Sequence, residues 1–277
     1  MEMHTIWKGS LQFGLVNIPV KLHAATEEKD VKFRTLHKPC HTPIKYEKVC
    51  PNCQKGVDSA ELVKAYEYTP GKFIVLEEGD LNKLEKEMEE RAVEILDFVD
   101  MAEIDPIFFR RAYYLSPNEG GGKAYSLLRK ALEKSKKVGI AKIMIRSKVQ
   151  LSAVRVFENT LVLETIHFPD EVRKPADVPN VPAEDKFSDQ ELEIALLLID
   201  RLSTEFSPEK YKDDYRESLL ELIEAKKKGE EFVTPDQEEK PSAVTDLLAA
   251  LQASIDRTKP EKKTAGKKGG KLARKKA

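Results

Sequence analysis

A proline-rich stretch at residues 169–182 divides this sequence into two parts with different patterns, because four of its fourteen residues are proline. Proline lacks a backbone N–H and can continue neither a helix nor a strand ladder. Before the stretch, short runs rich in β-branched and aromatic residues predict strands. After it, apolar residues recur with helical spacing. We therefore predict a mixed α/β fold, mainly β, with a core at residues 1–180 and a small helical domain at residues 183–230.

The core opens with a run of β-forming residues at 6–22 that Gly9, Gly14 and Pro19 interrupt. Such a run predicts two short strands that bend at glycine, as at the edge of a barrel. Glu158-Asn159 fits a tight turn between two later strands. The other predicted elements of the core are strands at residues 31–36, 73–76, 93–99, 104–115, 139–145, 151–157 and 160–168, and helices at residues 78–90 and 126–136.

The helical domain begins with a capping-box pattern, in which Ser188 is followed three residues later by Glu191. The apolar face of this first helix continues to Phe206, and Pro208 fits the first position of a second helix. Gly229 is a good C-terminal stop for the second helix. Two further segments are predicted: a linker and short amphipathic helix at residues 231–257, with the helix at 243–255, and a disordered tail at residues 258–277.

The net charge of −1 conceals a segregation of charge along the chain. Residues 1–180 carry +1, residues 181–256 carry −11 and residues 257–277 carry +9. The acidic helical block should avoid DNA and offer a surface to a basic partner. The candidate anchors for that partner are Leu196, Tyr211 and Tyr215. The alternative is that these apolar residues only pack the two helices on each other.

Two groups of cations are candidates for binding double-stranded DNA, because cations that neutralise phosphates release counterions and give sequence-independent affinity. The first is a basic band in the core, and its members are Lys123, Arg129, Lys130, Lys134, Lys136, Lys137, Lys142, Arg146 and Lys148. The alternative is that this band is only a solvated face. The second lies in the tail and consists of Lys262, Lys263, Lys267, Lys268, Lys271, Arg274, Lys275 and Lys276. Lysine on a flexible chain makes point-charge contacts without base readout. The alternative is that the tail only aids solubility.

All three cysteines fall at residues 37–53, where they form two pairs of metal-ligand type. His37 and Cys40 make the first pair, Cys50 and Cys53 make the second, and His41 is a spare ligand. Four such donors suit a closed, tetrahedral and structural zinc site of the knuckle kind. The alternative is that small thiols lie near a histidine by chance. An odd number of cysteines argues against a disulfide framework.

The sequence carries no motif of an enzyme, since it lacks G-x-S-x-G, H-E-x-x-H, a nucleotide-binding G-x-G-x-x-G and a phosphoryl-transfer set. A zinc-containing nucleic-acid enzyme would need a metal with an open coordination position, whereas the cysteine pairs predict a closed one. No run of ~18 apolar residues and no secretory signal is present, so we expect a cytoplasmic protein that is not bound to a membrane.

Several blocks of the sequence resemble bacterial Ku proteins in the same order along the chain. The N-terminal run IWKGSLQFGLVNIPVKLH is the most specific of them. The later blocks are VKAYEY at 63–68, IDPIFFRRAYYLSP at 104–117, YSLLRKALEKSKKVGIAKI at 125–143, the helical part at 187–229 and AVTDLLAALQASI at 243–255. The resemblance covers nearly the whole chain.

The resemblance implies a homodimer whose Ku-type β-barrels and bridging arms close a ring around the end of a DNA duplex. Such proteins act in non-homologous end joining at double-strand breaks, and they recruit and stimulate the multifunctional ligase D chiefly through the helical domain. The lysine-rich tail would help to hold DNA, and the protein would be nucleoid-associated. By position, Arg110, Arg111 and residues 123–148 are expected in the bridging half, where Arg110 and Arg111 join the basic band as DNA-binding candidates that face the duplex. The alternative function is that of a nonspecific nucleoid-associated DNA-packaging protein.

Overall fold

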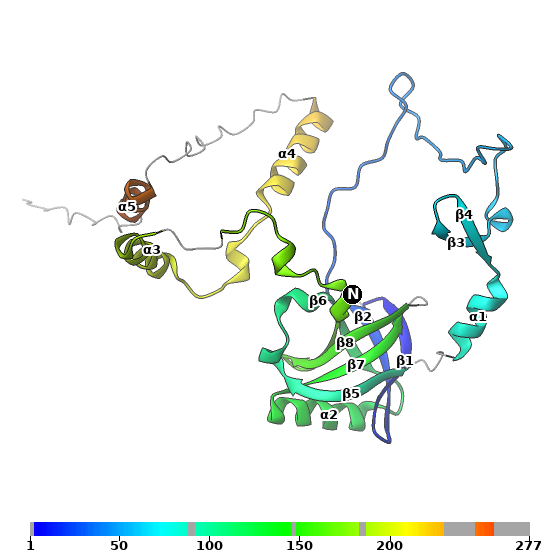
Figure 1. Cartoon of the computed structure of the whole chain (residues 1–277), viewed down its shortest axis with the longest axis horizontal. Helices are drawn as coiled ribbons and strands as arrows, with labels where there is room; N and C mark the ends of the chain where they lie inside the picture. Colours follow the sequence, from blue (N-terminus) through cyan, green and yellow to red (C-terminus); the bar gives the residue numbers. More distant parts are fainter. Residues whose placement is uncertain (1–2, 88–91, 146–147, 183–186, 230–246, 258–277) are drawn as a thin grey trace, which may run out of the picture. The chain divides into compact units, whose positions relative to one another are not determined.

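The computed structural model describes residues 3–87, 92–145, 148–182, 187–229 and 247–257. It divides the chain into two compact units, Met1–Pro179 and Asn180–Ala277 (Figure 1). The first unit contains all of the described strands, and the second contains helices. None of the described helices is long and apolar enough to span a bilayer.

Seven strands of the first unit form a closed barrel in the order β1-β2-β6-β9-β8-β7-β5. Neighbouring strands pair antiparallel, except that β1 and β5 pair in parallel and thereby close the barrel. The mainly β fold and the barrel predicted from the sequence are confirmed. The strands are β1 (Thr5–Phe13), β2 (Val16–Ala24), β5 (Ala92–Asp100), β6 (Phe109–Pro117), β7 (Lys137–Ile145), β8 (Lys148–Phe157) and β9 (Thr160–Ile166).

Short turns set the register of the two hairpins that the sequence predicted. Gly14, with φ +57°, lies in the turn between β1 and β2, where a residue without a Cβ adopts the left-handed conformation without cost. Glu158 and Asn159 join β8 to β9, and Glu158 has φ 50°. Two-residue loops of this kind match the twist of the flanking strands. Both predicted turns are therefore confirmed.

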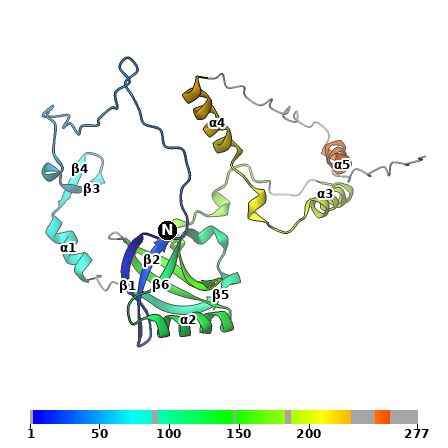
Figure 2. The ribbon, with the colours of Figure 1, turned by 180° about the vertical axis from the view of Figure 1, so that it is seen from behind.

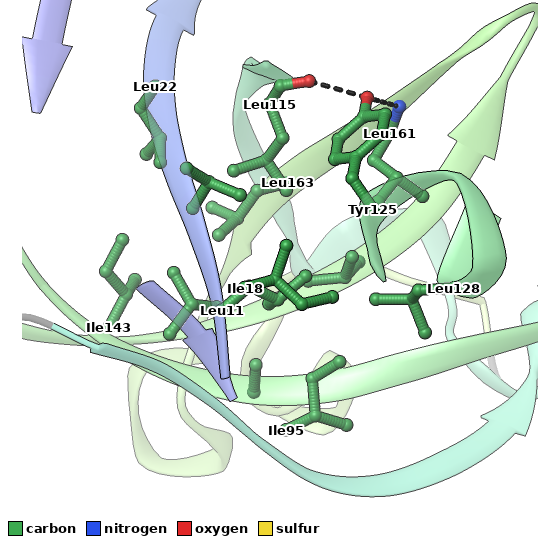
Figure 3. Packing of buried hydrophobic residues seen from close by; sticks show 14 of the residues in the cluster. Leu11, Ile18, Leu22, Ile95, Leu115, Tyr125, Leu128, Ile143, Leu161 and Leu163 are labelled. Carbon is green, nitrogen blue, oxygen red and sulfur yellow. Dashed lines mark hydrogen bonds between the residues drawn. The ribbon is translucent and has the colours of Figure 1, made fainter. Parts of the chain in front are cut away.

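The barrel interior is filled by aliphatic side chains from its strands (Figure 3). Leu11, Ile18, Leu22, Leu115 and Leu163 are fully buried there. Burying each such side chain contributes roughly 1.5–3 kcal/mol relative to leaving it in water. This cluster is the hydrophobic core of the first unit.

Helix α2 (Gly122–Ser135) connects the end of β6 to the start of β7 and adds Tyr125, Leu128 and Leu132 to the core. Its position against the barrel is visible in both ribbon views (Figures 1 and 2). The hydroxyl of Tyr125 donates to the Leu115 carbonyl at 2.7 Å and accepts from the Leu161 N–H at 2.8 Å (Figure 3). A Cβ at Gly121 would lie 2.6 Å from the Pro19 carbonyl oxygen, so glycine permits this close approach. The helix is thus fixed to the barrel by packing and by one buried hydroxyl.

The segment between β2 and β5 differs from the sequence prediction. The strand expected at residues 31–36 is wrong, because only an isolated bridge from Leu36 to Pro43 forms there. An alternating pattern makes a strand only where a partner strand supplies ladder hydrogen bonds. The regular elements of this segment are the antiparallel pair β3 (Lys64–Thr69) and β4 (Lys72–Leu76) and the helix α1 (Glu78–Glu87).

The second unit contains α3 (Asp189–Leu202), α4 (Asp214–Lys228) and α5 (Leu247–Arg257). The Ser188 capping box is confirmed, and so is the stop at Gly229, which has φ 77°. The helix expected from Pro208 begins later, since Asp213 accepts from the Arg216 N–H and caps α4. The short 3-10 turns of the chain are Ser59–Glu61, Met101–Glu103, Pro106–Phe108, Pro169–Glu171, Pro175–Asp177 and Pro208–Lys210.

Replacing Tyr125 by phenylalanine tests the hydroxyl that ties α2 to the barrel. The change keeps the ring but leaves the Leu161 N–H and the Leu115 carbonyl without this partner. We expect Tyr125→Phe to lower the free energy of unfolding by about 1–3 kcal/mol in urea titrations. Tyr114→Phe is the matched control, because among the described residues the Tyr114 hydroxyl has no hydrogen bond to lose. Equal stability of the two variants would contradict the assigned role.

Candidate nucleic-acid interface

The barrel is hollowed at the end opposite the connection through α2. The hollow has a volume of about 920 Å³ and lies between the starts of β6 and β8 and the ends of β2, β7 and β9. We call it the barrel mouth. Its charged lining residues are the cations Lys32, Arg110, Arg111 and Lys148 and the carboxylates Glu27, Glu28 and Glu171.

A β-bulge brings the two arginines together at the barrel mouth. Phe109 pairs with Ile166 and Arg111 pairs with Thr165, so β6 has one extra residue, Arg110, against β9. Consecutive residues of a regular strand point to opposite faces, whereas here Arg110 and Arg111 are both exposed and both line the mouth. Bulges commonly re-aim side chains in this way and are frequent beside functional sites. The bulge thus converts an Arg-Arg dipeptide into a pair of neighbouring cations.

The buried hydroxyl of Thr165 holds the bulge in place. It accepts from the Arg111 N–H at 3.2 Å and donates to the Arg111 carbonyl at 3.3 Å, and Thr165 is 2% exposed. Without the hydroxyl, the Arg111 N–H and carbonyl would lose these two bonds to β9. Thr165 therefore supports the arginine pair without itself facing solvent.

Arg110 makes a loose ion pair inside the mouth. Its guanidinium Nη1 lies 3.8 Å from Glu171 Oε1, and both side chains are nearly half exposed. The pKa of Glu171 is lowered, first by the N–H of Phe168 and then by His167 and Arg110. An exposed pair of this kind is weak. Arg110 can therefore release Glu171 and form charge-assisted hydrogen bonds to another anion, such as a phosphate.

The basic band predicted from the sequence is divided between two ends of the barrel. Lys148 lies at the mouth with the arginines. Five other cations of the band lie on α2 or directly after it: Lys123, Arg129, Lys130, Lys134 and Lys136. Lys142 is exposed on β7. Two members form ion pairs, Lys130 with Glu133 at 2.9 Å and Lys137 with Asp100 at 2.8 Å. Arg146 and the tail cations lie outside the described residues.

The described cations of the band belong to the barrel. Residues 123–145 and Lys148 form α2, β7 and the start of β8, and Arg110 and Arg111 belong to β6. The structure thus places them on the barrel, and their expected place in a bridging half of the dimer stays a prediction. The segment outside the barrel is instead the insertion at residues 25–91 between β2 and β5, which we call the arm. Order in the sequence could not show which strands join the sheet.

The zinc site expected at residues 37–53 is not supported. His37 Nδ1 lies 3.0 Å from Cys40 Sγ, and Cys50 Sγ lies 3.4 Å from Cys53 Sγ, each pair within its own tight turn. Over the residues that the structure describes, no group of three or more histidine, cysteine or carboxylate side chains could hold a metal. The x2 spacing brings together only the two members of a pair, whereas a four-ligand site also requires the two turns to pack on each other.

The three partner-binding candidates of the helical unit are all exposed. Leu196 on α3 is 55% exposed, Tyr215 on α4 is 77% exposed, and Tyr211 between them is 68% exposed. Phe206, which was not among the predicted anchors, stacks on Tyr211 at a centroid distance of 5.9 Å and is itself 79% exposed. Large exposed aromatic groups are typical anchors of protein interfaces.

Comparison with known proteins identifies the family of this barrel. The model of the Ku70/Ku80 beta-barrel domain matches residues 12–194, which is more than half of the chain. The chain belongs to the Ku family. The resemblance noted in the sequence is thus confirmed, and the arm and barrel mouth are features of a Ku chain.

Curated relatives match this Ku chain over nearly its full length. The non-homologous end joining protein Ku of Bacillus subtilis (strain 168) is 53% identical, over 100% of this chain and 94% of the relative. The protein of the same name from Desulfitobacterium hafniense is 45% identical over 94% of this chain and 90% of its own. That from Archaeoglobus fulgidus is 40% identical over 93% of this chain and all of its own length.

Thr165→Val tests whether the buried hydroxyl positions the arginine pair. Valine keeps the volume but removes both bonds to Arg111, so we expect a loss of about 1–3 kcal/mol in unfolding free energy and weaker binding of linear duplex DNA. Thr160→Val is the control, since it removes a half-buried hydroxyl, which donates to the Leu115 carbonyl at 3.2 Å, at the other end of β9. It should lose stability and keep its DNA affinity. Equal DNA affinity of the two variants would contradict the role of the bulge.

Proposed function

We propose that this Ku chain forms a homodimeric ring that takes up ends of double-stranded DNA without reading their sequence, in break repair by non-homologous end joining. The names of its relatives support the pathway. The observation that carries the proposal is the arginine pair at the barrel mouth. The chain acts as a scaffold and not as an enzyme, as Ku-family proteins do.

The barrel mouth suits the DNA backbone and not the bases. Arg110 and Arg111 present planar guanidinium forks that match phosphate oxygens, and Lys148 and Lys32 add point charges. Contacts to phosphate position a protein on the duplex without reading its sequence. One carboxylate of the mouth, Glu171, pairs with Arg110. Binding would exchange a weak internal ion pair for phosphate contacts.

The arm supports a dimer, because it leaves apolar side chains uncovered. In the β3–β4 pair, Tyr66 is 65% exposed, Phe73 is 61% exposed and Ile74 is 51% exposed. A two-stranded sheet alone is marginally stable, and clustered exposed apolar groups mark interaction sites. A second copy of the chain offers the same surface, as a two-fold symmetric interface requires. Two arms that cover each other in this way would close the ring.

The helical unit is the proposed docking site for ligase D. Residues 181–256 carry a net charge of −11, which opposes binding to DNA and favours a basic protein surface. Leu196, Tyr211 and Tyr215 supply exposed apolar anchors within this acidic unit. Recruitment would bring the ligase to an end that the barrel holds, and its stimulation would follow from that proximity.

The lysine-rich tail is proposed as an auxiliary DNA contact in a cytoplasmic, nucleoid-associated protein. Its cations, from Lys262 to Lys276, lie outside the described residues, and the sequence carries this part of the proposal. Lysines separated by glycine and alanine make contacts that salt weakens strongly. The tail would therefore retain DNA that the ring already holds.

The double change Arg110→Gln/Arg111→Gln tests the barrel mouth as the DNA contact. Loss of two phosphate contacts in each subunit should reduce the slope of log affinity against log salt by about 2 per subunit. Fluorescence anisotropy with a linear duplex at several salt concentrations measures this slope. The control is Lys130→Gln/Lys134→Gln, which removes the same charge from α2. A larger change of slope in the α2 variant would contradict the assignment.

A further inference from the structure

Helix α5 packs on α3 inside the second unit, and Figures 1 and 2 show the two side by side. Ile255 of α5 is 2% exposed, and no other apolar side chain that the structure describes beyond residue 166 is buried. The guanidinium Nη1 of Arg201 on α3 donates to the Ile255 carbonyl at 3.2 Å. That carbonyl lies in the last turn of α5, where carbonyls lack partners within the helix. The end of α5 is therefore held on α3 by apolar burial and by a helix cap.

An apolar stripe lies on the buried side of α5. Leu248, Leu251 and Ile255 are separated by three and four residues, so they share one face of the helix, and all are at least half-buried. α5 has eleven residues, and isolated helices shorter than ~12–15 residues are marginal in water. The helical state of α5 therefore depends on its docking to the rest of the unit.

Docking of α5 on α3 closes a loop of the chain. The 44 residues 203–246 lie between the two helices and include α4. Among the described helices of this unit, α3 and α5 pack on each other most extensively, and α4 buries none of its own side chains. Bringing the ends of such a loop together costs conformational entropy. The α3–α5 contact offsets this cost, so the chain holds the end of α5 at a defined place on α3.

The lysine-rich tail begins where α5 ends. Arg257 is the last residue of α5, and the tail at residues 258–277 follows directly. Along the covalent chain, 91 residues (167–257) separate the end of β9 from the root of the tail. With α5 docked, 35 residues (167–201) lead from β9 to the end of α5, because the α3–α5 contact bridges the rest. Docking therefore shortens the connection between barrel and tail by more than half.

We infer that α5 is an anchor that fixes the root of the lysine-rich tail on α3, so that the tail acts on the DNA held by the barrel of the same chain. The inference rests on the proposed DNA contact of the tail. The effective concentration of a tethered group falls with roughly the −3/2 power of the length of its connection. Lengthening the connection from 35 to 91 residues would therefore lower the effective concentration of the tail at the DNA about fourfold. α5 thus sets how strongly the tail retains DNA.

Leu251→Asp/Ile255→Asp in the full chain tests the anchor. Two charges in the apolar stripe should undock α5, and hydrogen exchange should then show that the amides of α5 lose protection. Gln252→Asp/Ala253→Asp is the matched control, because both residues are exposed on the same helix and the added charge is the same. We expect the undocked variant to bind linear duplex DNA up to about fourfold more weakly than this control in fluorescence anisotropy. The control should keep α5 protected.

The same proteins without residues 258–277 separate the anchor from other effects of the substitutions. If α5 acts through the tail, the two truncated variants should bind DNA equally. Equal DNA affinity of the two full-length variants, or tighter binding by the undocked one, would overturn the anchor. A difference that persists after truncation would overturn it too, as would protected α5 amides in Leu251→Asp/Ile255→Asp. If truncation leaves the DNA affinity of the parent protein unchanged, the proposed tail contact is wrong, and the anchor with it.

Discussion

Parallel pairing between β1 and β5 closes the barrel, and the placement of the DNA contact depends on it. Ser10, Leu11 and Gln12 pair with Ala92, Val93 and Glu94 in that ladder. β2 is antiparallel to β1 and β5 is parallel to it, so the chain leaves the sheet after β2 and re-enters it at β5 on the other side of β1. β2 ends at the barrel mouth, and β5 runs away from the mouth alongside β1. Both roots of the arm therefore lie toward the same end of the barrel as the arginine pair.

The two ends of the barrel have different tasks. At one end α2 fills the core, and the Tyr125 hydroxyl satisfies backbone groups of β6 and β9. The other end remains hollow and carries the bulge at Arg110. A rigid, fully packed scaffold can hold such a bulge in one conformation, since Thr165 is buried against it. Stability and function thus occupy separate ends of one small barrel.

Local patterns predicted the elements well, because turns, caps and alternation are encoded by neighbouring residues. The Gly14 turn, the Ser188 capping box and the Gly229 stop follow from such signals. Arg110 and Arg111 were predicted as DNA-binding residues, but the bulge that exposes both could not be predicted, since it depends on which strand lies opposite β6. The zinc prediction is not supported for a related reason, because spacing shows that Cys50 and Cys53 are neighbours but not that a second pair joins them.

The most direct test of the proposed ring compares linear duplex DNA with a covalently closed circle of the same sequence. A ring that closes around the duplex needs a free end, whereas a surface that only attracts phosphates does not. The account predicts tight binding to the linear form, little binding to the closed circle, and full recovery of binding after one double-strand cut in the circle. Equal affinity for the linear form and the intact circle would contradict the ring and would favour a DNA-packaging protein.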